Sequence, residues 1–159
     1  MAILLSLDQI IEAQVRREPA SFSHYVLGMP YANLKAIIYP RPPYTSFTIK
    51  KRDGSDRTIF EPRKRLKIIQ LKVLAFLQKR STPLKPAVHG FVAKRSILTN
   101  ALVHCSPKNH HVFNIDLEDF FPSITFYRVR GVLLHHPFKF SHEVAAVIAH
   151  ICTLDKMLP

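Results

Sequence analysis

Apolar residues recur at the spacing of one helix face in several stretches of the chain, and each such stretch predicts a helix. The first runs from Leu4 to Arg17, with Ser6 as its expected N-cap and Pro19 as its stop. A less regular stretch from Tyr25 to Ile38 is expected to hold a second short helix. The beginning of the chain is therefore predicted to be helical.

A strongly periodic helix is predicted from Pro62 to about Arg80, because proline suits the first turn of a helix. Its expected core face is aliphatic and consists of Leu66, Ile69, Val73, Leu74 and Leu77. Three more helices are expected: one from Lys94 to His104, one capped by Ser123 or Thr125 and ended by Pro137, and one capped by Ser141. The last helix has a core face of Val144, Val147, Ile148 and Ile151.

Two stretches instead have the composition of strands. Between Tyr44 and Phe60, apolar positions flank the dipeptide Asp53-Gly54, which is typical of a hairpin turn. The run from Val112 to Leu117 predicts a short buried strand containing one carboxylate, Asp116. A carboxylate at the end of a buried strand is costly unless a cation meets it, which makes Asp116 a candidate functional residue. The alternative is a surface strand. Helices and strands together predict an α+β fold.

The composition adds a strong positive charge to this picture. Lys and Arg total 23 against 11 Asp and Glu, so the net charge is +12 and the isoelectric point is about 10.1. This excess indicates a polyanionic partner, most simply a nucleic acid, with a membrane surface as the competing partner. No apolar run approaches the roughly 20 residues that span a bilayer, so no membrane-spanning helix is expected, and a membrane is not among the expected partners.

The N-terminal segment and the cysteines bear on the cellular location of the protein. The segment from Met1 to Leu7 lacks the basic start and the cleavage site of a signal peptide. The two cysteines, Cys105 and Cys152, have no metal-like spacing. A reducing cytoplasm is therefore the expected location.

Basic residues gather at two places along the chain. The hairpin carries Lys50, Lys51 and Arg52 at its tip and Arg57 on the returning strand. It could hold a triphosphate, because ammonium and guanidinium groups match phosphate oxygens, or it could be a solvated edge whose lysines discourage aggregation. The following helix could lie along a nucleic-acid backbone or present a solvated face, and its basic residues are Arg63, Lys64, Arg65 and Lys67.

Several short motifs stand in a characteristic order. The hairpin ends in Arg57-Thr58-Ile59, and further on come Leu66-Lys67-Ile68-Ile69-Gln70, His89-Gly90-Phe91, Ser96-Ile97 and a last motif that runs from Asp116 to Ile124 through Phe120-Phe121-Pro122. In this order they closely resemble the first half of a bacterial reverse transcriptase, from about Tyr44 to the C-terminus. Within that family, the run from Asn100 to His104 fits the NAxxH motif typical of retron reverse transcriptases, ahead of group II intron maturases and other defence-associated relatives.

The resemblance implies roles at the reaction centre. Asp116 resembles the first catalytic aspartate, a ligand to both Mg²⁺ ions, and Leu117 would lend its backbone carbonyl to the nucleotide-side metal. Phe121 stands where the family keeps its steric gate against a ribose 2′-hydroxyl. The incoming deoxynucleoside triphosphate would be gripped by Arg57 together with Lys50 or Lys51.

The resemblance also implies contacts with nucleic acid. Gly90 and Phe91 resemble the loop near template and primer. Asn100 and His104 lie in the retron-specific insert, and the resemblance gives them a role in binding the cognate structured RNA or in the local architecture.

One departure from the family concerns its second metal-binding motif, Tyr-x-Asp-Asp. The 159 residues contain no adjacent Asp pair, and none of the tyrosines begins that motif. Glu118 and Asp119 do not replace these acids, because neighbours on a strand point to opposite faces. The implied fold is reverse-transcriptase fingers and a partial palm of a right-hand polymerase, truncated before the Tyr-x-Asp-Asp hairpin. The implied division is a helical extension (1–43), fingers with a retron-type insert (44–111) and a partial palm (112–159).

The function implied by the resemblance is RNA-directed DNA synthesis by two-Mg²⁺ nucleotidyl transfer, in antiphage defence. The implied partners are a structured non-coding RNA as template and primer, the DNA product, deoxynucleoside triphosphates, and a second chain that would supply the rest of the palm and the thumb. The chain alone is expected to be inactive. The alternative is a non-catalytic nucleic-acid-binding or interaction module that keeps the fingers fold.

A third interpretation concerns the histidines and a cysteine. A metal site could be built from His104, Cys105, His110 and His111 together with His135 or His136. Their spacing and ligand mix match no standard zinc pattern, which disfavours this interpretation.

Overall fold

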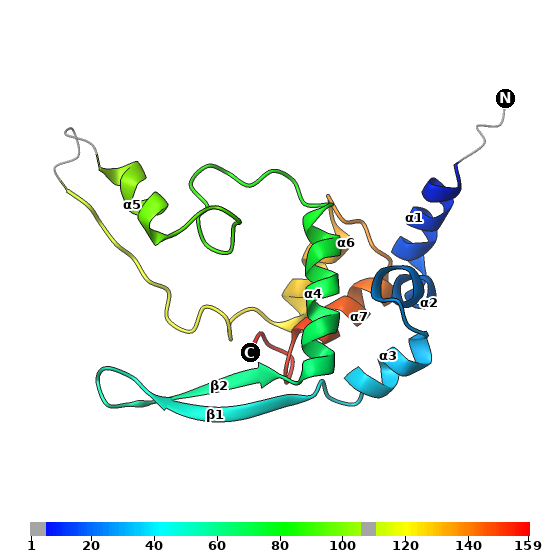
Figure 1. Ribbon diagram of the computed structural model, residues 1–159, viewed down its shortest axis with the longest axis horizontal. Coiled ribbons are helices and arrows are strands. Elements are labelled where there is room, and N and C mark those ends of the chain that lie inside the picture. Colours follow the sequence, from blue (N-terminus) through cyan, green and yellow to red (C-terminus); the bar gives the residue numbers. More distant parts are fainter. Residues whose placement is uncertain (1–5, 106–110) are drawn as a thin grey trace. The chain divides into compact units, whose positions relative to one another are not determined.

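The computed structural model describes residues 6–105 and 111–159, which divide into two compact units. The first unit comprises 1–81 and 119–159, and the second comprises 82–118. Within the described residues the first unit contains most of the helices and a two-stranded sheet, and the second contains a single helix (Figure 1). Helices and strands thus occur together, as the expected α+β class requires, while the division into extension, fingers and palm stays a prediction.

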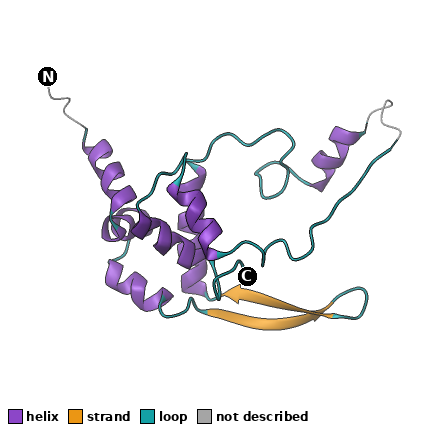
Figure 2. Ribbon diagram, turned by 180° about the vertical axis from the view of Figure 1, so that it is seen from behind, coloured by secondary structure: helices purple, strands orange, loops and turns teal. Residues whose placement is uncertain are grey.

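In the first unit, helices precede and follow one hairpin along the chain. Its helices are α1 (Leu7–Arg17), α2 (Pro19–Phe22), the π-helix η1 (Ser23–Leu27), α3 (Tyr31–Ile38), α4 (Lys64–Gln78), α6 (Phe126–Leu134) and α7 (His142–Cys152). Its antiparallel strands, drawn in orange in Figure 2, are β1 (Tyr44–Lys50) and β2 (Asp56–Pro62). The second unit contains α5 (Ile97–His104).

Side-chain caps explain where several helices begin. Ser6 and Gln9 form a reciprocal capping box at the start of α1, in which each side chain accepts a hydrogen bond from the backbone N–H of the other. Thr125 caps α6 and Ser141 caps α7, each by accepting a hydrogen bond from the backbone three residues on. These starts confirm the predictions, with Thr125 as the cap of α6. Leu4 lies outside the described residues.

The start of α4 differs from the prediction. Pro62 is the last residue of β2, opposite Tyr44, and α4 begins only at Lys64. The backbone N–H of Arg63 donates to the Pro43 carbonyl at 2.9 Å, so the hairpin ladder continues past Pro62. The expectation that Pro62 opens the helix was therefore wrong, because the strand pairing extends through this proline.

The core of the first unit lies where α4 and α7 meet each other and the N-terminal helices. Its fully buried side chains include Phe22, Leu27, Leu34, Ile38, Leu66, Ile69, Val73, Val144, Ile148 and Ile151. Leu74 was predicted to belong to this face but is 50% exposed. Since residues along a helix turn by about 100° each, Leu74 falls to the side of the face that Val73 occupies.

The segment from Val112 to Leu117 is the largest difference from the prediction. It forms no strand, and its side chains are exposed, with Phe113 at 86% and Ile115 at 76%. An apolar run becomes a strand only where a neighbour satisfies its backbone hydrogen bonds, and among the described residues only β1 and β2 form a sheet. The expected burial of the Asp116 strand in a palm sheet was therefore wrong for this structure.

Candidate nucleotide and nucleic-acid interface

The hairpin β1–β2 determines where its basic residues point. Arg57 lies opposite Ile49, and Lys50 lies opposite Asp56. Because side chains alternate between the two faces of a strand, Arg57 and Lys50 lie on opposite faces of the ribbon. The Lys50 Nζ forms an ion pair with Asp56 Oδ1 at 2.6 Å, on the exposed surface. Arg57 is therefore placed beside apolar side chains, and Lys50 is placed beside an acid.

The turn of the hairpin is built around the predicted Asp53-Gly54 dipeptide. Gly54 has a φ of 82°, a conformation that glycine adopts without steric cost, and its N–H donates to the Lys51 carbonyl at 3.1 Å. The Asp53 carboxylate accepts hydrogen bonds from the Ser55 hydroxyl at 2.6 Å and from the Ser55 N–H at 2.9 Å. These two bonds hold the pKa of Asp53 below its usual value, and the bond from the Ser55 hydroxyl has the larger effect. The turn is well ordered by its own side chains, and Lys51 lies in it.

The base of the hairpin is joined to the helices by a glutamine. Gln70 of α4 donates to the Tyr44 hydroxyl at 2.8 Å and to the Ile151 carbonyl at 2.9 Å. Burial raises the pKa of the Tyr44 hydroxyl above its ordinary value. These bonds link the first residue of β1 to α4 and α7, and so they orient the ribbon relative to the core of its unit.

The first turn of α4 is strongly basic. Arg63, Lys64, Arg65 and Lys67 are all exposed, and the helix has no acid in its first turn. Burial of Leu66 and Ile69 in the core directs these neighbours to solvent. The positive end of the helix dipole lies at the same place, so side chains and backbone add to one positive potential. Lys67 has a nearby acid, Glu61, at 3.8 Å.

The loop of the second unit that contains Gly90 and Phe91 is shaped by an arginine. The Arg95 guanidinium donates to the carbonyls of Lys85 and Pro86, both at 3.1 Å, and to that of Val88. Phe91 is 93% exposed and has a φ of 58°. An exposed aromatic ring in a left-handed conformation is unusual, and such strain is frequent at binding sites.

Helix α5 carries the two residues of the retron-type insert. Asn100 and His104 are one turn apart on the helix, and both are exposed. A capping box between Ser96 and Thr99 starts the helix, and His89 Nδ1 lies 3.0 Å from the Thr99 hydroxyl. The helix therefore presents Asn100 and His104 from a locally well-defined start.

Asp116 and Leu117 also belong to the second unit, and both are exposed. The Leu117 N–H donates to Asp116 Oδ1 at 3.0 Å. Phe121 belongs to the first unit, where its ring meets that of Phe120 edge to face at 5.4 Å. The structure thus defines the surroundings of each of these residues within its own unit.

The fit of a metal ion to these residues is partial. Mg²⁺ accepts oxygen ligands and needs only one or two protein carboxylates, so the Asp116 carboxylate and the Leu117 carbonyl are suitable donors. In residues 6–105 and 111–159, no three His, Cys, Asp or Glu side chains gather closely enough to hold a metal ion. His110, which entered the alternative metal site, lies outside the described residues. The described part of the chain also has no helix of the length and hydrophobicity that crossing a bilayer requires.

Sequence reasoning missed one group of side chains in the first unit. A pocket is lined by Arg41 from the linker before β1, by His150 from α7 and by Lys156 from the turn that follows α7. These residues are far apart in the sequence, and the only local signals are the run Pro40-Arg41-Pro42 and a charged pair in a turn.

Comparison with known proteins finds reverse transcriptases. The chain is 40% identical over 116 residues to the retron Mx65 reverse transcriptase of Myxococcus xanthus and 53% identical over 90 residues to the retron Mx162 reverse transcriptase of the same organism. It is 35% identical over 130 residues to the retron Ec73 reverse transcriptase of Escherichia coli. These alignments cover 73%, 57% and 76% of the chain, which spans 26%, 18% and 40% of the respective relatives. No protein-family model and no solved structure matches it.

These matches define the class of protein: the chain belongs to the family of RNA-directed DNA polymerases. The relatives named above are all reverse transcriptases of retrons, so the chain is of the retron type. The family assignment that rested on the order of the motifs from Arg57 to Ile124 is confirmed.

Proposed function

We propose that this chain contributes nucleotide- and template-binding surfaces to an RNA-directed DNA polymerase of the retron type. The observation that supports this most strongly is the identity of 53% over 90 residues to a retron reverse transcriptase. The antiphage role that the resemblance implies and the cytoplasmic location that the two cysteines indicate belong to the same proposal. The proposed partners are a structured RNA as template and primer, the DNA product and deoxynucleoside triphosphates.

The hairpin is the proposed triphosphate-binding element. Arg57 offers a planar guanidinium that can form paired hydrogen bonds with phosphate oxygens. It lies on an exposed strand, and Lys51 in the turn adds a second cation near the same end of the ribbon. Lys50 is the less suitable assistant, because it faces the other side and is paired with Asp56.

The basic start of α4 supports a polyanionic partner. A helix is normally stabilised by acids in its first turn, so cations at Lys64 and Arg65 oppose the dipole and cost stability. Phosphate groups of a nucleic acid would reverse this cost by neutralising the cations and the helix N-terminus together. Exposed Phe91 could stack on a base of the template or primer, with Gly90 beside it. Asn100 and His104 would contact the cognate RNA from α5.

Asp116 is the proposed catalytic aspartate, and its role is that of a metal ligand. Together with the Leu117 carbonyl it would bind Mg²⁺, which when bound stabilises negative charge on the reacting phosphate. Phe121 would exclude the 2′-hydroxyl of a ribonucleotide. Because the 159 residues contain no adjacent Asp pair, we propose that this polypeptide alone does not hold both ions and needs a second chain or segment to polymerise DNA.

Primer extension tests the proposal. The 159-residue polypeptide is incubated with an RNA template, a primer, Mg²⁺ and deoxynucleotides, alone and after addition of a polypeptide that supplies the remaining palm and thumb of a relative. We expect no extension alone and extension in the complemented reaction, abolished by Asp116→Asn. Phe121→Ala should admit ribonucleotides. Robust extension that survives Asp116→Asn would show that the catalytic residue has been placed wrongly.

A kinetic test distinguishes the role of Arg57 in nucleotide binding from the role of Asp116 in catalysis. In the complemented reaction, Arg57→Ala should raise the apparent KM for deoxynucleotides or slow nucleotide addition. Arg52→Ala is the matched control, since it removes the same charge from the tip of the same hairpin. Equal effects of both substitutions would argue against a specific role of Arg57.

The alternative function is a nucleic-acid-binding module without catalysis, which the exposed cations of α4 favour equally. Binding of a duplex RNA should weaken steeply with salt, because phosphate neutralisation releases counterions. The triple substitution of Lys64, Arg65 and Lys67 by Ala should reduce both affinity and salt dependence. The matched control removes three exposed cations elsewhere in the first unit: Arg17, Lys79 and Arg128. Binding without extension in the complemented reaction would favour the alternative.

A further inference from the structure

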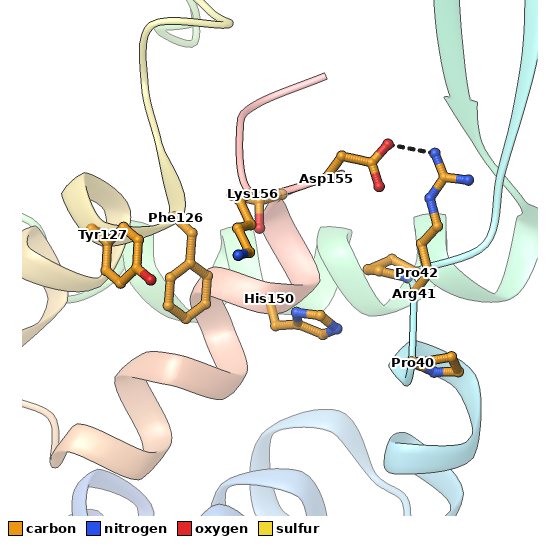
Figure 3. A pocket seen from close by; sticks show the side chains of 9 residues that line it. Pro40, Arg41, Pro42, Phe126, Tyr127, His150, Asp155 and Lys156 are labelled. Carbon is orange, nitrogen blue, oxygen red and sulfur yellow. Dashed lines mark hydrogen bonds and ion pairs between the residues drawn. The ribbon is translucent and has the colours of Figure 1, made fainter.

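A pocket of about 330 Å³ lies in the first unit between the linker that joins α3 to β1 and the chain that follows α7. Figure 3 shows Phe126 and Tyr127 on one side, Pro40 and Pro42 on the other, and His150 between them. Aromatic rings on one side of an open pocket and proline rings on the other form a space suited to a planar ligand. The volume is at the lower end of the range of about 300–1,000 Å³ for small-molecule pockets, which suits one nucleotide.

His150 is held in a defined orientation. Its ring stacks on Tyr39, with ring centroids 4.5 Å apart and planes 18° apart, and its Nε2 lies 3.0 Å from the Ile38 carbonyl. A carbonyl only accepts hydrogen bonds, so Nε2 carries the hydrogen and the Nδ1 of the neutral ring is an acceptor. A positioned ring nitrogen of this kind can accept a hydrogen bond from the edge of a base.

The turn after α7 is strained at two successive residues. Asp155 and Lys156 have φ angles of 48° and 68°, and the backbones of Leu154 and Met157 exchange hydrogen bonds of 2.8 and 3.1 Å around them. This is the geometry of a type I′ turn, which favours Asn-Gly or Asp-Gly, so Lys156 stands where glycine is preferred. Left-handed residues other than glycine cost free energy and gather at ligand clamps, so the side chains of this turn invite a functional explanation.

Both charged side chains of the turn reach the pocket. Asp155 forms an ion pair with Arg41 of the linker, with Nη2 and Oδ2 2.5 Å apart. Lys156 also lines the pocket, and within the described residues it takes part in no ion pair. Asp155 therefore links the turn to the linker through Arg41, and Lys156 supplies a cation to the pocket (Figure 3).

We propose that this pocket binds one unpaired nucleotide of single-stranded nucleic acid. The base lies between the aromatic wall and the two prolines, where His150 can read its edge, and a backbone phosphate meets the Lys156 ammonium. Unstacked bases bind sequence-tolerantly to aromatic faces beside basic groups, whereas a paired base has both faces covered. The residues that line it include neither Asp116 nor the hairpin residues proposed to bind the triphosphate, and its occupation does not depend on polymerase activity.

Two glycine substitutions test the charge. Lys156→Gly removes the ammonium and relieves the strain of the turn, so it should raise the thermal stability and weaken binding of a labelled pentaadenylate about three- to tenfold, with a salt slope lower by about 1. Lys139→Gly is the matched control, because Lys139 also has a left-handed φ, of 52°, is exposed and does not line the pocket. A purely structural role of Lys156 predicts higher stability with unchanged binding, which would overturn the proposal, as would equal effects of both substitutions.

A second pair of probes tests the base. Tyr127 is 66% exposed, so Tyr127→Ala should leave the fold intact while weakening pentaadenylate binding at least about fivefold. An abasic oligomer with the same number of phosphates should bind the unaltered chain more weakly than pentaadenylate. Comparison of pentaadenylate with the DNA oligomer of the same base sequence shows whether the 2′-hydroxyl contributes to binding. If the abasic oligomer binds as tightly as pentaadenylate, or if the unaltered chain binds neither at low salt, the proposal fails. These readouts are independent of primer extension, so they distinguish failure of this site from failure of the polymerase proposal.

Discussion

Helices α7 and α5 both follow a serine N-cap, Ser141 and Ser96, and both are rich in apolar residues. In α7 six residues are buried, while in α5 none is, and Ile97 of α5 is 90% exposed. The difference lies in their surroundings, since α7 packs against α4 and α6. Cap and apolar content therefore start a helix in both places, but only tertiary packing gives one of them a core.

Without buried side chains, α5 should be less stable than α7. An isolated helix shorter than about 12 residues is marginal in water, and α5 has 8 residues without a buried side chain. Its exposed Leu98, Leu102 and Val103 are available to a further surface. The first unit should accordingly unfold as a cooperative body, whereas α5 should open independently of it.

Hydrogen exchange should show the largest contrast between the two helices. Backbone amides of α7 exchange only when the core opens, so their protection should exceed that of α5 amides by at least about a thousandfold. The measurement is native-state exchange of the unliganded chain, followed by mass spectrometry or NMR. Comparable protection of α5 and α7 would mean that α5 is covered in solution.

Truncation of one apolar side chain should destabilise the protein much more in α7 than in α5, which is the next largest expected effect. Ile148 is fully buried, so Ile148→Ala should lower the free energy of unfolding by about 2–5 kcal/mol. Leu98, at 67% exposure, is the matched position in α5, and Leu98→Ala should change the free energy of unfolding by less than about 0.5 kcal/mol. Urea titrations followed by circular dichroism give both values, and similar losses would contradict the comparison.

The serine caps should differ by a smaller amount. Ser141→Ala should cost about 1 kcal/mol of global stability, since the hydroxyl caps α7 and also donates to the Arg17 carbonyl at 2.8 Å. Ser96→Ala removes an equivalent cap from α5, and we expect it to speed amide exchange there while leaving the urea midpoint of the first unit unchanged. A shift of that midpoint by Ser96→Ala would show that the two helices are coupled.

The smallest expected effect concerns the acid that joins α1 to α4. Glu12 lies between Arg80 and Arg16, and the Arg80 side chain, which is 20% exposed, also stacks on Phe76. Hydrogen bonding from Arg80, then from Arg16, holds the pKa of Glu12 below its ordinary value of 4.5, against the opposing effect of partial burial. A carboxyl whose pKa is lower in the folded state stabilises the fold above about pH 4.5 and loses this contribution as the pH falls through the folded pKa.

The pH dependence of unfolding tests this prediction. Between pH 5.5 and 3, Glu12→Gln should remove less than about 1 kcal/mol of the pH-dependent stability, because the pair is partly solvated. Glu118→Gln is the control for the loss of one acid, because Glu118 is exposed and takes part in none of the ion pairs of the described residues. An identical pH profile for Glu12→Gln and the unaltered chain would mean that the pair contributes nothing in solution.

Much of the local structure could be predicted, because it depends on neighbouring residues. Caps at Ser6 and Ser141 and the turn at Asp53-Gly54 use hydrogen bonds that span a few residues, and the sequence contains both partners in order. The family was likewise predictable, since motifs such as Arg57-Thr58-Ile59 are read in sequence order.

The candidate site was predictable only as a set of residues. The roles of Asp116, Arg57 and Phe121 come from the resemblance, and the structure adds surroundings without assembling a metal site from the described residues. The exposure of Asp116 could not be predicted, because the apolar run around it has the same composition whether or not a neighbouring strand exists.

What the sequence alone determined about this protein is its family, its charge and the starts of its helices. Only the tertiary structure showed that Leu74 leaves the core and that Lys50 and Arg57 face apart across the ribbon. The pocket shows the same limit, because its Arg41–Asp155 ion pair joins residues 114 positions apart. Local hydrogen bonds are encoded by neighbours in the chain, whereas pockets and cores form when distant segments meet, and no local pattern records which segments those are.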